Sequence, residues 1–214
     1  MMISPDSYYL FNLLPKSRSH AKEEITRLRE EMKKLKYNIE KPTEEFHLTH
    51  PSDDTKLYWT RQYLQKAIKA YKEKGGKYEP TEEEIQSKRF NENVPHLKEI
   101  TAEKRSYSPN DDFILSVKFE ENEVVVSKTD TAYEKGMTNE KFDKQYILEE
   151  LKDLYIGEWE NEYTPEKFGI TIMDGFSWDI EFVFSNKEET KRVLCQNIEP
   201  HNFNDFLNLF SKDE

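Results

Sequence analysis

Between residues 19 and 40, apolar side chains alternate at intervals of four and three, which is the heptad pattern of one helical face. These positions are Ala21, Ile25, Leu28, Met32, Leu35 and Ile39. Ser19 is a candidate N-cap, Glu23 and Glu24 suit the positive end of a helix dipole, and Pro42 ends the segment. The pattern predicts a long amphipathic helix, whose apolar seam is satisfied equally by packing within the chain or between two chains.

Two further helices are predicted in the first hundred residues. The second covers 54–74, with Gly75-Gly76 as its stop signal. We predict a basic face on it, opposite its apolar face, as a partner-binding surface that stays mostly exposed to solvent. This face consists of Arg61, Lys66, Lys69 and Lys72. Thr81–Glu84 forms a capping box and predicts a short third helix over 82–91. We assign residues 1–100 to a helical arm, in which the first two helices form an antiparallel hairpin.

Residues 105–214 show strand periodicity instead. Five strands are predicted, over 113–119, 123–129, 168–173, 178–184 and 190–196, and two helices over 139–155 and 202–210. The order ββαβββα, with hairpin-length turns, predicts an antiparallel sheet with helices on one face. The whole chain is therefore expected to be α+β. Residues 93–110 contain Pro95 and Pro109 and few large apolar side chains, so we expect a linker there.

Charge divides the chain in the same way. The net charge is −11, from 32 basic and 43 acidic residues. Residues 1–100 carry 19 basic and 17 acidic side chains, whereas residues 101–214 carry 13 and 26. Such asymmetry predicts two units with different surfaces. The 13 Phe, 12 Tyr and 3 Trp argue against disorder, because disordered chains are poor in aromatic residues.

No apolar run approaches the roughly 20 residues that span a bilayer, and the first residues lack the pattern of a signal peptide. We therefore expect a cytoplasmic protein with no membrane partner. The single cysteine, Cys195, excludes an intramolecular disulfide and a thiolate zinc site. It lies on a predicted strand, which indicates a packing role.

The sequence offers little catalytic chemistry. It contains no GxGxxG, GxxxxGK, GxSxG or HExxH motif. His47 and His50, among acidic residues, are weak candidates for metal ligands. We expect no catalytic residue, no cofactor and no metal, and treat a metal-dependent hydrolase only as a third hypothesis.

A conspicuous run begins at Met173 and continues through Phe182. Its marked residues, with those that follow it, are Asp174, Gly175, Trp178, Asn197, Pro200 and Phe203. The run resembles a domain of unknown function that is common in proteins of low-GC Gram-positive bacteria (Firmicutes). That domain carries Asp-Gly, two residues, Trp, alternating apolar residues, Gly-x-Asn-x-x-Pro and an aromatic helix.

The resemblance covers about residues 105–214 and departs at Cys195, where the family pattern has glycine. It implies a fold and a bacterial source but no activity. We interpret the six marked residues as structural: Trp178 as a core anchor, and Asn197 and Pro200 as the turn before the last helix.

The leading hypothesis is a non-catalytic bacterial interaction protein of the regulator, immunity or inhibitor type, with a protein partner. The alternative is a nucleic-acid-binding module on residues 56–78, where Lys and Arg are interleaved with aromatic side chains. These aromatic residues are Tyr58, Trp59, Tyr63 and Tyr71. The net charge of −11 opposes this alternative, because it repels a polyanion at long range. The sequence sets no oligomeric state.

Overall fold

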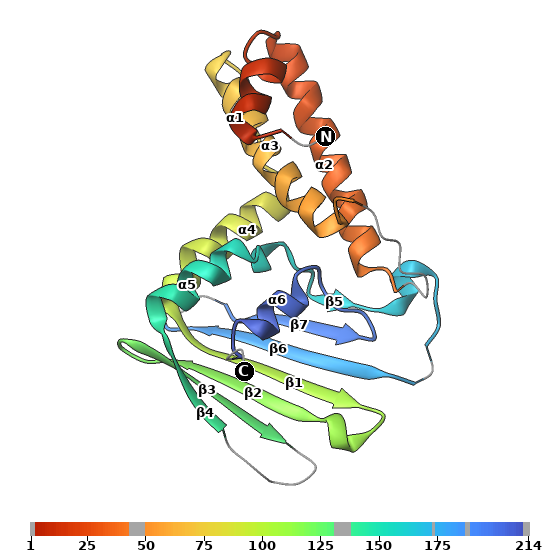
Figure 1. The fold of residues 1–214 in the computed structure, drawn as a ribbon, viewed down its shortest axis with the longest axis vertical. Coiled ribbons are helices and arrows are strands. Elements are labelled where there is room, and N and C mark those ends of the chain that lie inside the picture. The colour runs from red at the N-terminus through yellow and green to blue at the C-terminus, as the bar shows by residue number, and fades with distance from the viewer. Residues whose placement is uncertain (1–2, 43–49, 131–137, 173, 187–188, 212–214) are drawn as a thin grey trace. The chain divides into compact units, whose positions relative to one another are not determined.

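The structure is a computed structural model, and it describes residues 3–42, 50–130, 138–172, 174–186 and 189–211. The chain divides into two compact units, Met1–Pro80 (unit 1) and Thr81–Glu214 (unit 2) (Figure 1). Unit 1 is helical and unit 2 contains a seven-stranded sheet with helices, which confirms the predicted α+β class. The boundary follows Pro80, whereas the sequence placed it near residue 100.

Unit 1 is a helical hairpin with a short N-terminal addition. Its elements are α1 (Pro5–Tyr8), the π-helix η1 (Tyr9–Leu13), α2 (Arg18–Glu40) and α3 (Asp53–Glu73). The cap of α2 is Ser17, whose side chain accepts a hydrogen bond from the backbone N–H of His20, and not Ser19 as predicted. The helix thus begins earlier than expected, and its first turn contains Arg18 and no acidic residue.

The heptad seam of α2 packs within the chain. Ala21, Ile25 and Leu28 are buried in one cluster with residues of α3, namely Leu64, Ala67 and Ala70. Tyr8 and Leu13 join this cluster from the N-terminal addition. The question of intrachain or interchain pairing, which the sequence left open, is thus decided for these residues by their contacts with α3.

Unit 2 is built on one sheet in the order β4-β3-β2-β1-β6-β7-β5 (Figure 1). Its strands are β1 (Leu97–Ser106), β2 (Phe113–Phe119), β3 (Glu123–Asp130), β4 (Thr138–Asp143), β5 (Glu162–Tyr163), β6 (Phe176–Phe184) and β7 (Lys191–Gln196). Its α-helices are α4 (Glu82–Asn93), α5 (Lys144–Asp153) and α6 (Phe203–Asn208). All neighbouring strands are antiparallel except β5 and β7, which are parallel.

The core of unit 2 lies between the sheet and its helices. Along β6, Trp178, Ile180, Phe182 and Phe184 are buried, and Asp179 and Glu181 alternate with them on the other face, as predicted. Phe90 of α4, Ile147 of α5 and Phe206 of α6 belong to the same buried cluster. The three helices therefore supply one continuous core.

The predicted linker over 93–110 is wrong, because this stretch contains the central strand β1. Ile100 pairs with Val117 of β2 on one side and with Phe182 of β6 on the other. The third helix also belongs to unit 2 and not to the arm. Its Phe90 meets Phe182 and Phe184 at ring-centroid distances of 5.4 and 6.0 Å.

Two other predicted elements differ from the structure. The helix predicted over 139–155 is divided into β4 and α5, and Asp143 caps the latter by accepting from the N–H of Tyr146 at 2.8 Å. The strand predicted over 168–173 is wrong. A 3₁₀ turn, η5 (Pro165–Phe168), ends at the left-handed Gly169, and no strand follows in the described residues 170–172. The observed order from β1 onward is ββββαβββα.

Candidate functional site

The predicted basic face of α3 is not one surface. Arg61 follows Leu57 by four residues and precedes Leu64 by three, so helix geometry places it on the buried face. Only 5% of Arg61 is exposed, which corrects its assignment to an open binding surface.

The three lysines of this face contact the N-terminal addition or nearby side chains of unit 1. Lys66 donates to Asp6 Oδ1 at 2.6 Å, and this hydrogen bond lowers the pKa of Asp6. The Lys69 Nζ lies 3.9 Å from Glu73 and 5.2 Å from the ring centre of Tyr9. The Lys72 Nζ lies 5.2 Å from the ring centre of Tyr78.

Aromatic side chains of α3 also serve packing. The Tyr63 hydroxyl donates to the carbonyl of Ile3 at 2.6 Å, and its ring stacks on Tyr8 at 4.3 Å. Tyr71 packs against the buried cluster of unit 1. Tyr58 is exposed, with Trp59 edge-on to it at 5.9 Å. Half of the aromatic set that suggested base stacking is therefore engaged inside unit 1.

A different surface of unit 1 combines exposed apolar groups with positive charge. Leu10, Phe11 and Leu14 are 51%, 70% and 48% exposed. Lys74 lies next to them, since its Nζ donates to the carbonyl of Leu14 at 3.1 Å. We call this surface the basic tip. It comprises the three apolar residues and the cations of residues 9–22 and 69–77, which are Lys16, Arg18, Lys22, Lys69, Lys72, Lys74 and Lys77.

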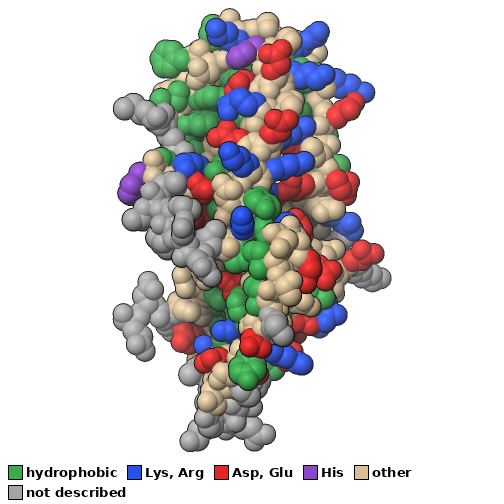
Figure 2. All heavy atoms as spheres, turned by 90° about the vertical axis from the view of Figure 1, so that its right-hand side faces the viewer, with side chains coloured by type: hydrophobic (Ala, Val, Ile, Leu, Met, Phe, Trp, Pro, Cys, Tyr) green, Lys and Arg blue, Asp and Glu red, His purple; other side chains and the backbone are tan. Residues whose placement is uncertain are grey.

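The two stretches of the basic tip carry seven cations, and the carboxylates Asp6, Glu23 and Glu24 lie close to them in the sequence. Glu73 is the one acidic residue in these two stretches, and it accepts a hydrogen bond from Tyr9. Arg18 and Lys22 lie near the start of α2, where the positive end of the helix dipole disfavours cations. Hydrophobic (green), basic (blue) and acidic (red) side chains share the surface at the upper end of unit 1 (Figure 2). The stability of the hairpin does not explain the exposure of the three apolar side chains, whereas Lys69, Lys72 and Lys74 also make contacts within unit 1.

The residues of the family-like motif hold the β6–β7 hairpin together. Gly175 has a φ of 156°, and a Cβ there would lie 1.7 Å from Asn197 Oδ1. That oxygen accepts from the N–H of Phe176 at 2.7 Å. Trp178 is buried and its Nε1 donates to Glu199 Oε1 at 3.0 Å, while burial raises the pKa of Glu199.

The other motif residues lie around this hairpin. Pro200 and Phe203 are buried and Asp174 is exposed. Phe203 meets the ring of Trp178 at 5.1 Å, which connects α6 to the sheet.

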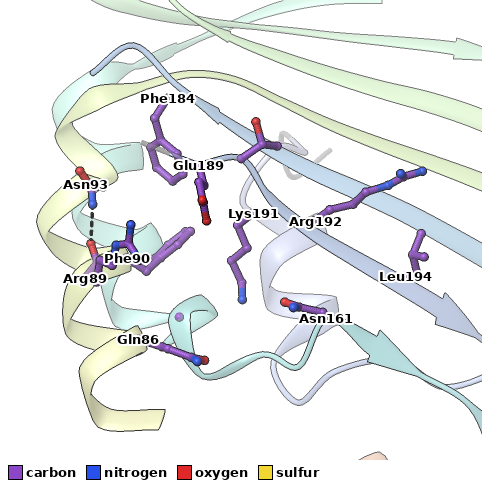
Figure 3. Close-up of a pocket in the computed structure, with 12 residues that line it drawn as sticks. Gln86, Arg89, Phe90, Asn93, Asn161, Phe184, Glu189, Lys191, Arg192 and Leu194 are labelled. Atoms are coloured by element: carbon purple, nitrogen blue, oxygen red, sulfur yellow. Dashed lines mark hydrogen bonds between the residues drawn. The ribbon is translucent and has the colours of Figure 1, made fainter. Parts of the chain in front are cut away.

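Unit 2 contains a pocket of about 450 Å³ between α4 and the start of β7 (Figure 3). Gln86, Arg89 and Asn93 line it from α4, and Lys191 lines it from β7. Asn161 closes the end nearest β5. The sequence analysis named none of these residues as a site.

Lys191 occupies a position on the core face of β7, which Val193 and Cys195 share. Its amine donates to the carbonyl of Trp159 at 2.9 Å. Burial lowers its pKa to about 8. No carboxylate of the described residues forms an ion pair with it. The sequence carries no signal for this site, because Val193, Leu194 and Cys195 are all apolar and do not show which face Lys191 occupies.

A glycine sets the depth of the pocket. Gly157 belongs to the short 3₁₀ segment η4 (Ile156–Glu158). A Cβ on Gly157 would lie 2.5 Å from Ser87 Cα and 2.8 Å from Phe90 Cβ. Only glycine allows η4 to approach α4 this closely.

The metal hypothesis gains no support from geometry. In the part of the chain that the structure describes, no three His, Cys, Asp or Glu side chains gather as a metal site. His50 is exposed, and His47 lies outside the described residues. The helices in the described ranges include none that is long and apolar enough to cross a membrane.

Comparisons of this chain with family models, curated proteins and solved structures found no match. The basic tip and the pocket of unit 2 are therefore interpreted from their own geometry and charge.

Proposed function

We propose that this protein is a non-catalytic, cytoplasmic interaction protein that binds an acidic protein partner through the basic tip. The observation that carries the proposal is three exposed apolar side chains, Leu10, Phe11 and Leu14, in a segment with Lys69 beside Tyr9 and Lys74 at the carbonyl of Leu14. A regulator, immunity protein or inhibitor acts through such a contact.

The cations and the apolar side chains of the basic tip contribute to binding in different ways. The cations accelerate the encounter with an acidic surface and orient it, because opposite charges attract before contact. The apolar residues Leu10, Phe11 and Leu14 then lose water on contact, which stabilises the complex. An exposed phenylalanine flanked by leucines is a suitable central anchor for a protein interface.

Nucleic acid is the less favoured partner for this surface. Base stacking needs accessible aromatic side chains, yet Tyr63 and Tyr71 pack within unit 1. Two of the three exposed apolar residues of the tip are aliphatic, and leucine offers a base no stacking face. An acidic protein with an apolar patch matches both features.

A photo-crosslinking amino acid at Phe11 tests the proposal in a nuclease-treated lysate of the source organism. We expect a crosslinked protein that is absent when the same group is placed at the exposed Tyr58. The yield of this crosslinked product should fall at least tenfold in the double variant Leu10→Ser/Leu14→Ser and in the double variant Lys69→Glu/Lys72→Glu. The matched control, Lys33→Glu/Lys34→Glu, changes exposed charges of α2 outside the tip and should leave it intact.

Equal crosslinking from Phe11 and Tyr58, or a product that the tip variants do not reduce, would refute a protein interface at the tip. A product that forms in an untreated lysate but not in the nuclease-treated lysate would favour the nucleic-acid alternative. Binding of the purified protein to vesicles of anionic lipid, lost in the Leu10→Ser/Leu14→Ser variant, would instead identify a membrane surface as the partner.

A further inference from the structure

Strand β7 has a neighbour along only part of its outer edge. β5 pairs with it at Leu194 and Cys195. Within the described ranges, no strand pairs with Lys191–Val193 on that side. The first half of β7 thus has no strand partner on this side, and we call it the open edge; the carbonyl of Trp159, which accepts from Lys191, lies near its start.

The backbone of Arg192 faces this open edge. The N–H of Leu194 points toward β5, because it donates to the carbonyl of Asn161 at 2.9 Å. In an antiparallel pair, successive residues direct their backbone groups alternately toward and away from the partner strand. Arg192, two residues before Leu194, therefore directs its N–H and C=O away from β6.

The open edge forms one wall of the pocket, and α4 forms the other (Figure 3). A groove between an edge strand and a helix accepts an extended peptide, which pairs with the strand and places alternate side chains in the groove. The volume of about 450 Å³ accommodates a few residues rather than a whole strand. The geometry suits a short extended segment.

Charge indicates which segment fits. Unit 2 carries 16 basic and 31 acidic residues, a net charge of −15. The pocket differs from this balance, since the side chains of Arg89 and Lys191 line it with one carboxylate, Glu189, while Arg192 borders it as part of β7. Arg192 already donates to Asp179 at 2.8 Å across the strand pair. Lys191 donates to one backbone carbonyl, and an ammonium group has three donors.

We propose that unit 2 binds an extended acidic segment of another polypeptide as an added strand beside Arg192, with a carboxylate of that segment against Lys191. The carboxylate belongs to an Asp or Glu side chain of that segment. This site lies in unit 2 and is independent of the contact proposed for the basic tip.

Selection from displayed random dodecapeptides tests the proposal, with one library displayed internally and one with free C-termini. We expect both selections on the intact protein to enrich peptides that contain Asp or Glu. Fluorescence polarisation of an enriched peptide then compares three forms: unchanged, with Asp and Glu replaced by Asn and Gln, and with an amidated C-terminus. The Asn/Gln form should bind at least tenfold more weakly than the unchanged peptide, and a loss confined to the amidated form would overturn the proposal.

A pair of variants at one position isolates the backbone contact. Arg192→Pro removes the outward N–H, whereas Arg192→Ala removes the side chain and keeps the N–H. We expect at least tenfold weaker binding for Arg192→Pro than for Arg192→Ala. Lys191→Met should lower the affinity for the acidic peptide at least tenfold and leave the affinity for its Asn/Gln form unchanged.

Hydrogen exchange provides a test that needs no variant. The amide of Arg192 in the natural protein should exchange at least tenfold more slowly when an enriched peptide is bound. Absence of this protection overturns the proposal even if Arg192→Pro does not fold. Enrichment of neutral or basic peptides, or no enrichment at all, also overturns it.

Discussion

The two units are stabilised by different kinds of contact. Unit 1 buries mostly small and aliphatic side chains, such as Ala21 and Leu28 against Ala67, along two helices that are adjacent in sequence. Unit 2 relies on aromatic side chains and on pairings between distant segments, such as Leu97 with Phe184. The difference teaches that helical periodicity specifies the contact between α2 and α3 in the first core, whereas the second core depends on tertiary pairing.

The units differ equally in charge. Unit 1 carries 16 basic and 12 acidic residues, and unit 2 carries 16 and 31. The structural boundary makes the asymmetry larger than the sequence suggested. Within each unit one surface stands out: the basic tip in unit 1, where exposed apolar groups accompany the charge, and the locally basic pocket in unit 2. The proposed sites are thus both sites for acidic partners.

The largest expected effect tests whether the two cores are separate. Phe182 is fully buried and meets the rings of Phe90, Trp159 and Phe206. Phe182→Ala should lower the free energy of unfolding of unit 2 by about 3–5 kcal/mol, because it leaves a cavity. Hydrogen exchange should accelerate across unit 2 and stay unchanged in α2 and α3. The reciprocal variant Leu64→Ala should affect unit 1 alone, and equal acceleration in both units would mean one cooperative core.

A smaller effect is expected at the β6–β7 hairpin. Gly175→Ala combines an unfavourable φ with a clash against Asn197 and should cost unit 2 about 2–3 kcal/mol. The matched control is Gly169→Ala, where φ is 67° and the space around a Cβ is open, so the cost should be about 1 kcal/mol. Denaturant titrations of both variants measure the difference. Equal costs would show that the contact with Asn197 is not restrictive.

Lys191 should make the stability of unit 2 depend on pH. Its pKa is about 8 in the folded protein and about 10.5 in the unfolded chain, so the unfolded chain holds more protons between these values. Stability should therefore rise with pH from about 8 to 10.5. Lys191→Met removes this dependence and should stabilise unit 2 by up to about 3 kcal/mol below pH 8. In thermal unfolding, the difference in melting temperature between the variant and the natural protein should disappear by pH 10.5. A difference that stays constant with pH would contradict this prediction.

The smallest effect concerns the basic tip. Arg18→Glu places a carboxylate at the positive end of α2 and should stabilise unit 1 by about 0.3–1 kcal/mol. The same change should reduce crosslinking from Phe11, so stability and binding move in opposite directions. Lys33→Glu, in the middle of α2, is the control and should change neither. Loss of both stability and crosslinking in Arg18→Glu would indicate that Arg18 supports the hairpin itself.

Local patterns predicted a large part of the fold. The heptad of α2, the capping box of Thr81 and Glu84, and the alternation along β6 all appear in the structure. Each of these signals is complete within one helix or one strand. Arg61 was also readable from the helix period, since it lies on the face of Leu57 and Leu64, and the prediction of an exposed Arg61 was wrong for that reason.

The sequence by itself determined the amphipathic helices, the α+β class and the unequal charge, because these depend on spacing and composition. Only the tertiary structure decided that β1 is the central strand. Its polar residues conceal the short core-facing pair of Ile100 and Ala102, and its stability comes from partners on both sides, β2 and β6. The pocket could not be predicted from the sequence either. Lys191 and Arg89 are a hundred residues apart and line one pocket only because α4 packs beside β7. The spacing of residues predicts which face of a helix or strand each one occupies, whereas only the tertiary structure determines which residues pack against that face.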